Sequence, residues 1–464
     1  MSANMSSVTG ESPDHAVDVP PRATRMVKRE VPPDGNRAWL FVFIAYLLSV
    51  VVSGLPPCFG PIKAAITEEF PDTSTSTLGQ FPSLVSNLSL LLSPIATLVV
   101  LKCGPRLSLF LGGLFSVIGL GLSSFAKCAG FLVFSYGVVV GIGSSLIVAS
   151  LLSQIAALFT SRKPLAFALY MCGECTGAFV LPFLIDFLLG EYGWRMVFFV
   201  LCVLNVPTCL AAAAFERPEF YFVEISEEVE IKNPTEEERP AMVVPIPEVP
   251  ISSSLKLWHN IRDSTGLTLL KKWELWLMLV AIASHGFGSA GLKSIFENGL
   301  KEHEFPIGHT YCFLMTVFVR FTYGLFSGQS RIPRNLEYFL SSLANVGGAI
   351  LMLGVGCETV AHYLVVLCLM AIGNGIWGVL TPVVIGENVG SIPKAFAWIK
   401  CIRGILALLF PLLKDHVKQD RGQEVVDAMS AALASSAAIV SLLFFLFKTL
   451  GKCYRSATAT STRL

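Results

Sequence analysis

The sequence predicts an all-α membrane protein with twelve transmembrane helices in two pseudo-symmetric six-helix halves. Composition gives the first reason: 53% of the 464 residues are hydrophobic and only 14% are charged. A soluble globular chain carries about 25% charged residues, so this much apolar surface cannot all be buried in a water-soluble core. The second reason is that apolar runs of about 20 residues, enough to cross a bilayer, recur along the chain. A polar break then separates the first six runs from the last six.

The spans follow from these runs in chain order. They are expected at 39–60, 78–101, 107–126, 131–159, 164–190, 195–215, 273–296, 308–329, 336–356, 360–386, 396–413 and 424–447. The break contains clustered acids and prolines, which favour a linker rather than a third domain. The chain is therefore divided into a disordered N-terminal segment 1–37, a first half 38–215, a linker 216–266, a second half 267–447 and a tail 448–464.

Lysine and arginine mark alternate loops. Basic residues stand at 25–37, 102–106, 162–163, 271–272, 331–334 and 448–455, whereas the intervening loops are acidic or mixed. By the positive-inside rule, both termini and the linker are expected in the cytoplasm of a multi-pass plasma-membrane protein. The formal net charge of +1 gives no basic field for nucleic acid. The first apolar run begins too late for a cleaved signal peptide.

Two six-helix halves joined by a long linker resemble the major facilitator fold, in which the ligand site lies near the membrane midplane between the halves. Three motifs narrow the resemblance. DGNRAW holds Asp34, Gly35 and Trp39, and LFTSRKPLAFALYMCGECTG holds Arg162, Lys163, Gly173 and Gly177. The third is GNGIWGVLTPVVIGENVG at 373–390. Together they are similar to the signatures of the monocarboxylate transporter family.

Arg320 lies inside the apolar stretch VFVRFTYGLFSG. Counted from the cytoplasmic end of its span, it is ~15 Å deep in a core of ~30 Å. A charge at that depth indicates a functional site, and a guanidinium can grip a carboxylate through two parallel hydrogen bonds. The resemblance implies this role for an arginine followed by glycine four residues later, as Gly324 is here. The other interpretation is a structural arginine that pairs with an internal acid or caps helix carbonyls.

Two features of proton-coupled relatives are missing. The resemblance implies an aspartate four residues before the arginine, where this chain has Thr316, and a lysine near the outer end of the first span. Pro57 stands at the latter position, with Cys58 as its nearest polar neighbour. Threonine cannot titrate as aspartate does, and cysteine is mostly neutral at pH 7. Glu174, also about mid-depth, is the proton-coupling candidate. The alternative is that it neutralises Arg320 or Arg403.

Other residues complete the expected binding site. Arg403 is expected to reach the cavity, while Lys400 is close enough to the cytoplasm to extend toward it. Phe321 and Trp377 are candidates for an apolar subsite, though aromatic residues at helical spacing also serve packing. His285 falls in the outer half of its span, where a vestibule or a solvated helix end is expected.

The sequence therefore predicts a secondary-active or facilitative carrier of a small monocarboxylate or related organic anion, working by alternating access. One alternative is a proton-independent carrier of a larger or amino-acid-like carboxylate. Another is a non-transporting receptor that kept the fold. The chain shows no nucleophile–base pair, phosphate-binding loop or metal-ligand cluster, so no enzyme, cofactor or metal is expected. The resemblance also allows a single-span accessory glycoprotein as partner.

Overall fold

The computed structural model describes residues 23–30, 35–70, 84–214, 222–229, 266–302, 308–328, 332–352, 360–421, 425, 429, 432–433 and 435–446. Contacts divide the chain into two units, which are described separately: Met1–Val31 with Pro218–Ser252, and Pro32–Arg217 with Ser253–Leu464.

The smaller unit contains a two-stranded antiparallel sheet. Strand β1 spans Ala23–Glu30 and strand β2 spans Phe222–Val229. Its register sets Arg25 opposite Glu227 and Lys28 opposite Glu224. Opposite charges on paired positions favour such a register. The N-terminal segment predicted to be disordered therefore includes a strand, because a partner strand lies in the linker far away in the sequence.

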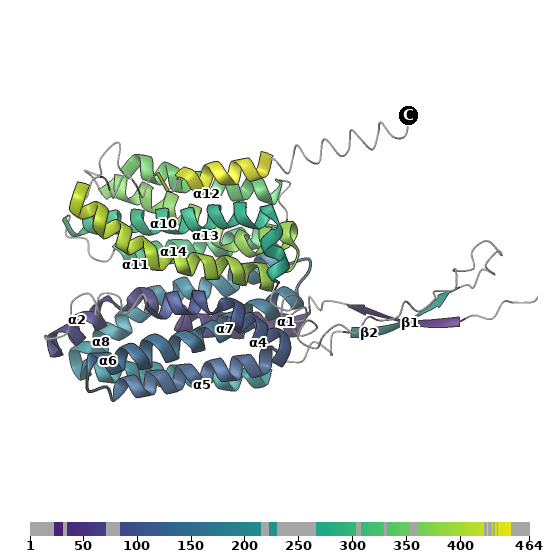
Figure 1. Ribbon diagram of the computed structural model, residues 1–464, viewed down its shortest axis with the longest axis horizontal. Helices are drawn as coiled ribbons and strands as arrows, with labels where there is room; N and C mark the ends of the chain where they lie inside the picture. Colours follow the sequence, from purple (N-terminus) through teal and green to yellow (C-terminus); the bar gives the residue numbers. More distant parts are fainter. Residues whose placement is uncertain are drawn as a thin grey trace, which may run out of the picture. The chain divides into compact units, whose positions relative to one another are not determined.

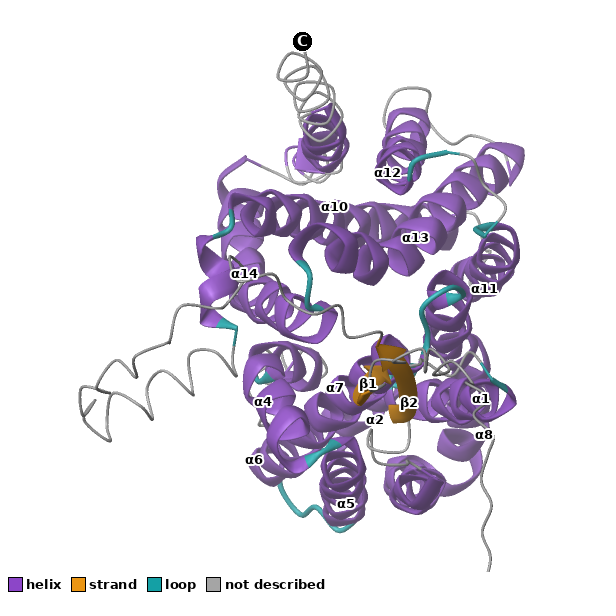
Figure 2. Cartoon of the chain, turned by 90° about the vertical axis from the view of Figure 1, so that its right-hand side faces the viewer, coloured by secondary structure: helices purple, strands orange, loops and turns teal. Residues whose placement is uncertain are grey.

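The larger unit is helical, and its helices form two bundles (Figures 1 and 2). The first bundle contains α1 (Asn36–Val52), η1 (Pro56–Cys58), α2 (Gly60–Glu69), a helix at Leu84–Leu91, α4 (Ser93–Cys103), α5 (Pro105–Ser124), α6 (Ala129–Leu132), η2 (Val133–Val140), α7 (Gly141–Leu158), α8 (Lys163–Ala211) and η3 (Ala212–Ala214). The second contains η6 (Leu267–Lys271), α10 (Trp273–Glu302), α11 (Gly308–Phe326), α12 (Arg334–Ile350), α13 (Val360–Val389), α14 (Ile392–Arg421) and a helix at Ser435–Leu446.

Among the described residues, five helices are long and apolar enough to cross a membrane, and a bent pair at Leu84–Leu91 and Ser93–Cys103 makes a sixth. One of the five, α8, covers two predicted spans. Gly193 inside it has φ +77° and ψ 173°, so the backbone leaves the helix there. Glycine occupies positive φ without a steric penalty, which explains why the chain turns at this residue. The total of twelve spans stays a prediction.

Helices α1 and α8 meet at glycines of the second sequence signature. A Cβ atom on Gly177 would lie 2.8 Å from Cα of Gly54 and would also clash with the carbonyl oxygen of Val50. A Cβ on Gly173 would lie 2.8 Å from Cβ of Ser49. Small residues let membrane helices approach closely, where van der Waals packing replaces the hydrophobic effect. These signature glycines therefore have a structural reason in this chain.

The two bundles touch along two seams: α8 meets α11 and α13 in the first, and α4 and α7 meet α14 in the second (Figure 2). In the first seam α11 contacts α8: a Cβ on Gly324 would lie 2.6 Å from Cβ of Ala168, and the thiol of Cys172 is 3.6 Å from the carbonyl oxygen of Val317. In the second seam α14 contacts α4, and Gly404 packs on the Leu84–Leu91 helix near Leu90. A side chain that projects from one of these helices into the region bounded by the two seams therefore lies between the two halves.

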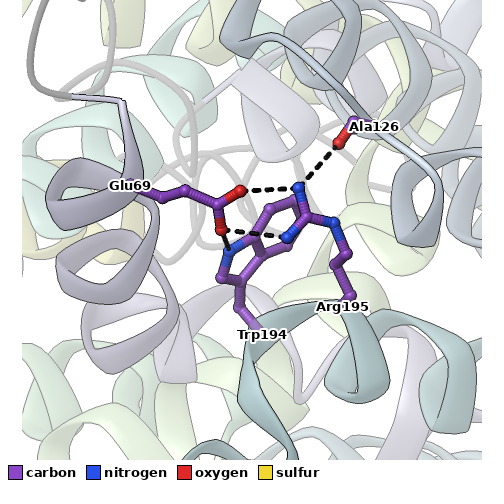
Figure 3. Close-up of polar contacts among 4 residues, drawn as sticks. All are labelled: Glu69, Ala126, Trp194 and Arg195. Carbon is purple, nitrogen blue, oxygen red and sulfur yellow. Dashed lines mark hydrogen bonds and ion pairs between the residues drawn. The ribbon is translucent and has the colours of Figure 1, made fainter.

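A polar brace joins α2 to the bend of α8 (Figure 3). Arg195 donates two hydrogen bonds to the carboxylate of Glu69, at 3.0 and 2.6 Å, and the indole nitrogen of Trp194 donates a third at 2.6 Å. Arg195 also donates to the carbonyl oxygen of Ala126 at 3.3 Å and stacks on the Trp194 ring at 4.3 Å. The end of α2, the turn after α5 and the bend of α8 are thus tied together.

This brace makes a prediction for stability against pH. The hydrogen bonds from Arg195 hold the pKa of the Glu69 carboxyl below its usual range; Trp194 adds to this effect and burial opposes it. Because the folded pKa is depressed, the contribution is present at neutral pH and is lost as pH falls through the folded value, below about pH 4. The pair is largely exposed, so Glu69→Gln is expected to lower the melting temperature by only about 1–2 °C at neutral pH.

The measurement is thermal unfolding of the purified protein in detergent at neutral and acid pH. Glu68→Gln is the matched control, since Glu68 is an exposed neighbour on the same helix. The difference between the two variants should vanish in acid. A Glu69→Gln protein as stable as the Glu68→Gln protein at neutral pH would show that the brace contributes nothing.

Candidate functional site

Arg320 lies on α11 and is directed toward α8 of the other half. The residue is only 8% exposed, whereas the next residue, Phe321, is 43% exposed on the outer surface of the helix. Nη1 of Arg320 donates a hydrogen bond to the carbonyl oxygen of Met171 and lies 3.8 Å from Oε2 of Glu174. Nε is buried and has no hydrogen-bond partner among the described residues. The guanidinium therefore lies between the halves, away from the lipid-facing surface, and is only partly satisfied.

Two glycines bring the surrounding backbone close to this guanidinium. Gly324, one turn further along α11, lets the helix approach Ala168 of α8. Gly378 of α13 lies against the guanidinium, because a Cβ there would be 3.2 Å from Nη2. The edge of the guanidinium formed by Nε and Nη2 thus faces Gly378, which has no side chain. That edge offers the two parallel N–H groups that fit a carboxylate.

Glu174 is the one acidic side chain that the described residues place against Arg320. Its side chain is 47% exposed, so it is accessible from the space between the halves. The 3.8 Å separation is an ion pair at long range, and the Arg320 proton donor closest to it is already used by Met171. This arrangement matches the interpretation of Glu174 as a neutralising partner. Its role as a proton carrier stays a prediction.

A second cationic group comes from α14. The guanidinium of Arg403 lies against Gly286 of α10, where a Cβ would be 2.9–3.0 Å from its Nη2, Cζ and Nε. Glu174 interacts electrostatically with both Arg403 and Lys400. The ammonium of Lys400 lies 4.8 Å from the ring centroid of Phe396, one turn nearer the start of α14. Arg403 therefore joins the charged group, and Lys400 lies beside it.

An aromatic stack lies next to both arginines. The rings of His285 and Trp377 are parallel, with centroids 3.8 Å apart and an interplanar angle of 6°. Tyr338 also stacks on Trp377, with centroids 5.8 Å apart. His285 is only 3% exposed. The expectation of a vestibule or a solvated helix end for His285 was wrong, because the residue packs its ring on α13 instead of reaching the end of α10.

A chain of polar side chains continues from the stack. Nε2 of His285 is 3.3 Å from Oδ1 of Asn374, whose amide nitrogen donates to Oδ1 of Asn345 at 3.2 Å. Sequence reasoning did not single out either asparagine, Tyr338, Gly286 or Gly378. The available signal was the presence of asparagines within apolar spans, where polar groups are rare and functional by default.

The remaining predicted residues lie elsewhere. The hydroxyl of Thr316 donates to the carbonyl oxygen of Cys312 within its own helix at 2.8 Å. The thiol of Cys58 donates to the carbonyl oxygens of Gly54 and Ala178 inside the first half. Trp39 packs edge-on against Phe159 with centroids 4.9 Å apart. Their predicted roles in binding or as signature residues stay predictions, and Asp34 lies outside the described residues.

Two apolar helical bundles with three cations and a carboxylate between them define an integral membrane protein whose site is built by both halves. Residues 39–411 match the Major Facilitator Superfamily, and the chain belongs to this family. Members of this superfamily are membrane transporters, and the chain has the multi-pass helical architecture of that class.

Individual proteins agree with this assignment. Monocarboxylate transporter 14 of Mus musculus is 28% identical over 180 residues, which are 39% of this chain and 35% of that protein. Monocarboxylate transporter 12 of Homo sapiens is 28% identical over 193 residues, 40% of this chain and 36% of that protein. The aligned part thus spans little more than a third of these relatives. They confirm the resemblance to the monocarboxylate transporters.

The fold is confirmed separately by a solved structure. The proton:xylose symporter XylE superposes with a TM-score of 0.67 at 12% sequence identity, covering 88% of this chain and 96% of that chain. At this identity the likeness concerns the major facilitator fold alone.

Proposed function

We propose that the protein carries a small monocarboxylate or related organic anion across the plasma membrane by alternating access of its two halves. Arg320 is the anchor for the substrate carboxylate. The observation that supports this proposal is the buried guanidinium with an unpartnered Nε, set beside Gly378. A buried N–H without a partner costs about 1–3 kcal/mol, and more for a charged group, so this edge favours an acceptor that arrives with the substrate.

The contacts of Arg320 suggest how binding is linked to movement of the halves. The arginine belongs to the second half, yet its Nη1 is held by Met171 and faces Glu174 of the first half. A substrate carboxylate that competes with these contacts would change the interaction between the halves at the α8–α11 seam. Alternating access in this fold requires that kind of coupling between the bound ligand and the two rigid halves.

The receptor alternative is not favoured, since the matching relatives are named as transporters. A cytoplasmic location of both termini is part of the proposal and rests on the distribution of lysine and arginine.

Uptake into reconstituted vesicles tests the proposed function. Labelled lactate, pyruvate, ketone bodies, aromatic amino acids and creatine are offered at two external pH values, with Arg320→Ala protein as the blank. We expect saturable uptake of at least one carboxylate by the wild type and none above background by the variant. Equal uptake by both proteins would refute Arg320 as the anchor.

Glu174→Gln separates proton carriage from simple charge compensation. A carboxylate that carries the coupled proton would make uptake by the wild type increase as external pH falls, and the glutamine variant would lose that dependence. Initial uptake rates are measured over a series of external pH values in both proteins. If wild type and Glu174→Gln show the same pH dependence, Glu174 does not carry the proton and remains a partner of Arg320.

A further inference from the structure

The charges between the halves do not balance. Among the described residues, Arg320, Arg403 and Lys400 supply three positive charges to this region, and Glu174 is the carboxylate that interacts with all three. Uncompensated charge within the membrane core is costly, even when the side chains face a wet interior. With Glu174 counted, the three cations leave a net charge of about +2. A monoanionic substrate would reduce this net charge to +1, whereas a dianionic substrate would reduce it to zero.

The two guanidiniums lie against different helices of the second half. The guanidinium of Arg320 lies against Gly378 of α13, and that of Arg403 lies against Gly286 of α10. In the sequence, Gly378 directly follows Trp377 on α13, and Gly286 directly follows His285 on α10. Trp377 and His285 carry the two stacked rings. The two guanidiniums are therefore associated with different members of one stacked pair. This arrangement provides two separate positive groups, each beside a glycine next to the aromatic stack, instead of one double clamp.

Buried donors without acceptors accompany the second group. Nδ2 of Asn345 has no hydrogen-bond partner among the described residues, and Nε1 of Trp377 has no well-directed one. The hydroxyl of Tyr338 lies close to Trp377 and Thr381 but forms no well-directed hydrogen bond, and it interacts electrostatically with Arg403. Buried donors are normally satisfied, so their number here favours a ligand rich in acceptor oxygens.

We propose that Arg403, assisted by Lys400, forms a second anion subsite, and that the preferred substrate is a small dicarboxylate held by Arg320 at one end and Arg403 at the other. The carbon chain of the substrate would pass beside the stack of His285, Trp377 and Tyr338. This inference rests on the proposed function, in which Arg320 binds a carboxylate. It adds the second pole and the charge of the substrate.

Uptake of succinate, a four-carbon dicarboxylate, is compared with uptake of pyruvate in vesicles that contain the full chain at neutral pH. We expect Arg403→Gln to lower kcat/KM for succinate about tenfold or more and to change that for pyruvate less than about threefold, because only the dianion loses a paired charge. Arg403→Lys keeps the charge and should restore most succinate uptake. Lys127→Gln, which removes an exposed positive charge outside the site, is the matched control.

Each other outcome has a definite meaning. Equal losses of succinate and pyruvate uptake in a monodisperse, thermally stable Arg403→Gln protein would overturn the second subsite. Pyruvate uptake without succinate uptake would also overturn it; if that uptake also required chloride in the buffer, the second positive group would bind an inorganic anion. Failure of the proposed function looks different: neither carboxylate is transported, or Arg320→Ala protein transports both at the wild-type rate.

Discussion

Arg320→Lys is expected to reduce kcat/KM for carboxylate uptake about 100-fold or more while the protein still reaches the membrane. Lysine keeps the positive charge, so the pairing with Glu174 and the folded state should survive. It lacks the planar fork, and it cannot present the parallel Nε and Nη2 donors that face Gly378. Loss of two hydrogen bonds to a charged group, each about 1.5–3 kcal/mol, corresponds to a reduction of this size.

The measurement is the initial rate of uptake in reconstituted vesicles, normalised to the amount of inserted protein. Arg106→Lys is the matched control, because Arg106 is exposed in the first turn of α5 and far from the seam residues in sequence. Its uptake should stay within about twofold of the wild type, as surface substitutions usually do. Full transport by Arg320→Lys would mean that the arginine acts only as a charge, and the bidentate clamp would have to be abandoned.

Gly177→Ala is expected to cause the largest loss of stability, about 2–3 kcal/mol after the better helix propensity of alanine is included. The added Cβ would meet backbone atoms at the end of α1 and just after it, at the carbonyl oxygen of Val50 and Cα of Gly54. Backbone atoms cannot move aside as the end of a flexible side chain can, so α1 and α8 must separate. Their contact is an extensive helix pair within the first half.

Size-exclusion profiles and thermal unfolding in detergent measure this effect. Gly347→Ala is a suitable control, since its Cβ would meet its nearest neighbour, Cδ1 of Leu369, at an ordinary distance of 3.8 Å. We expect the control to fold like the wild type and the Gly177→Ala protein to aggregate or melt several degrees lower. Wild-type stability of Gly177→Ala would show that the two helices have room to separate in the native protein.

Arg320 and Gly177 could both be identified from the sequence, because the signals that mark them are local along the chain. The position of Arg320 within an apolar run fixes its depth, and depth alone makes the charge significant. Gly173 and Gly177 were identified through their motif, and only the contacts with α1 explain why no Cβ is accepted there. The strand at Ala23–Glu30 was not expected, since its partner lies nearly 200 positions away and no local pattern identifies it.

By itself the sequence determined the membrane class, the two halves, the break between them and the charged residues at mid-depth, because the length of an apolar run and the cost of burying a charge depend on the residues themselves. The tertiary structure alone decided which groups meet. It set Met171 and Glu174 beside Arg320 across 149 and 146 positions, and it placed His285 on the ring of Trp377. Such partnerships depend on how separate helices cross, and hydropathy along one chain contains no information about that geometry.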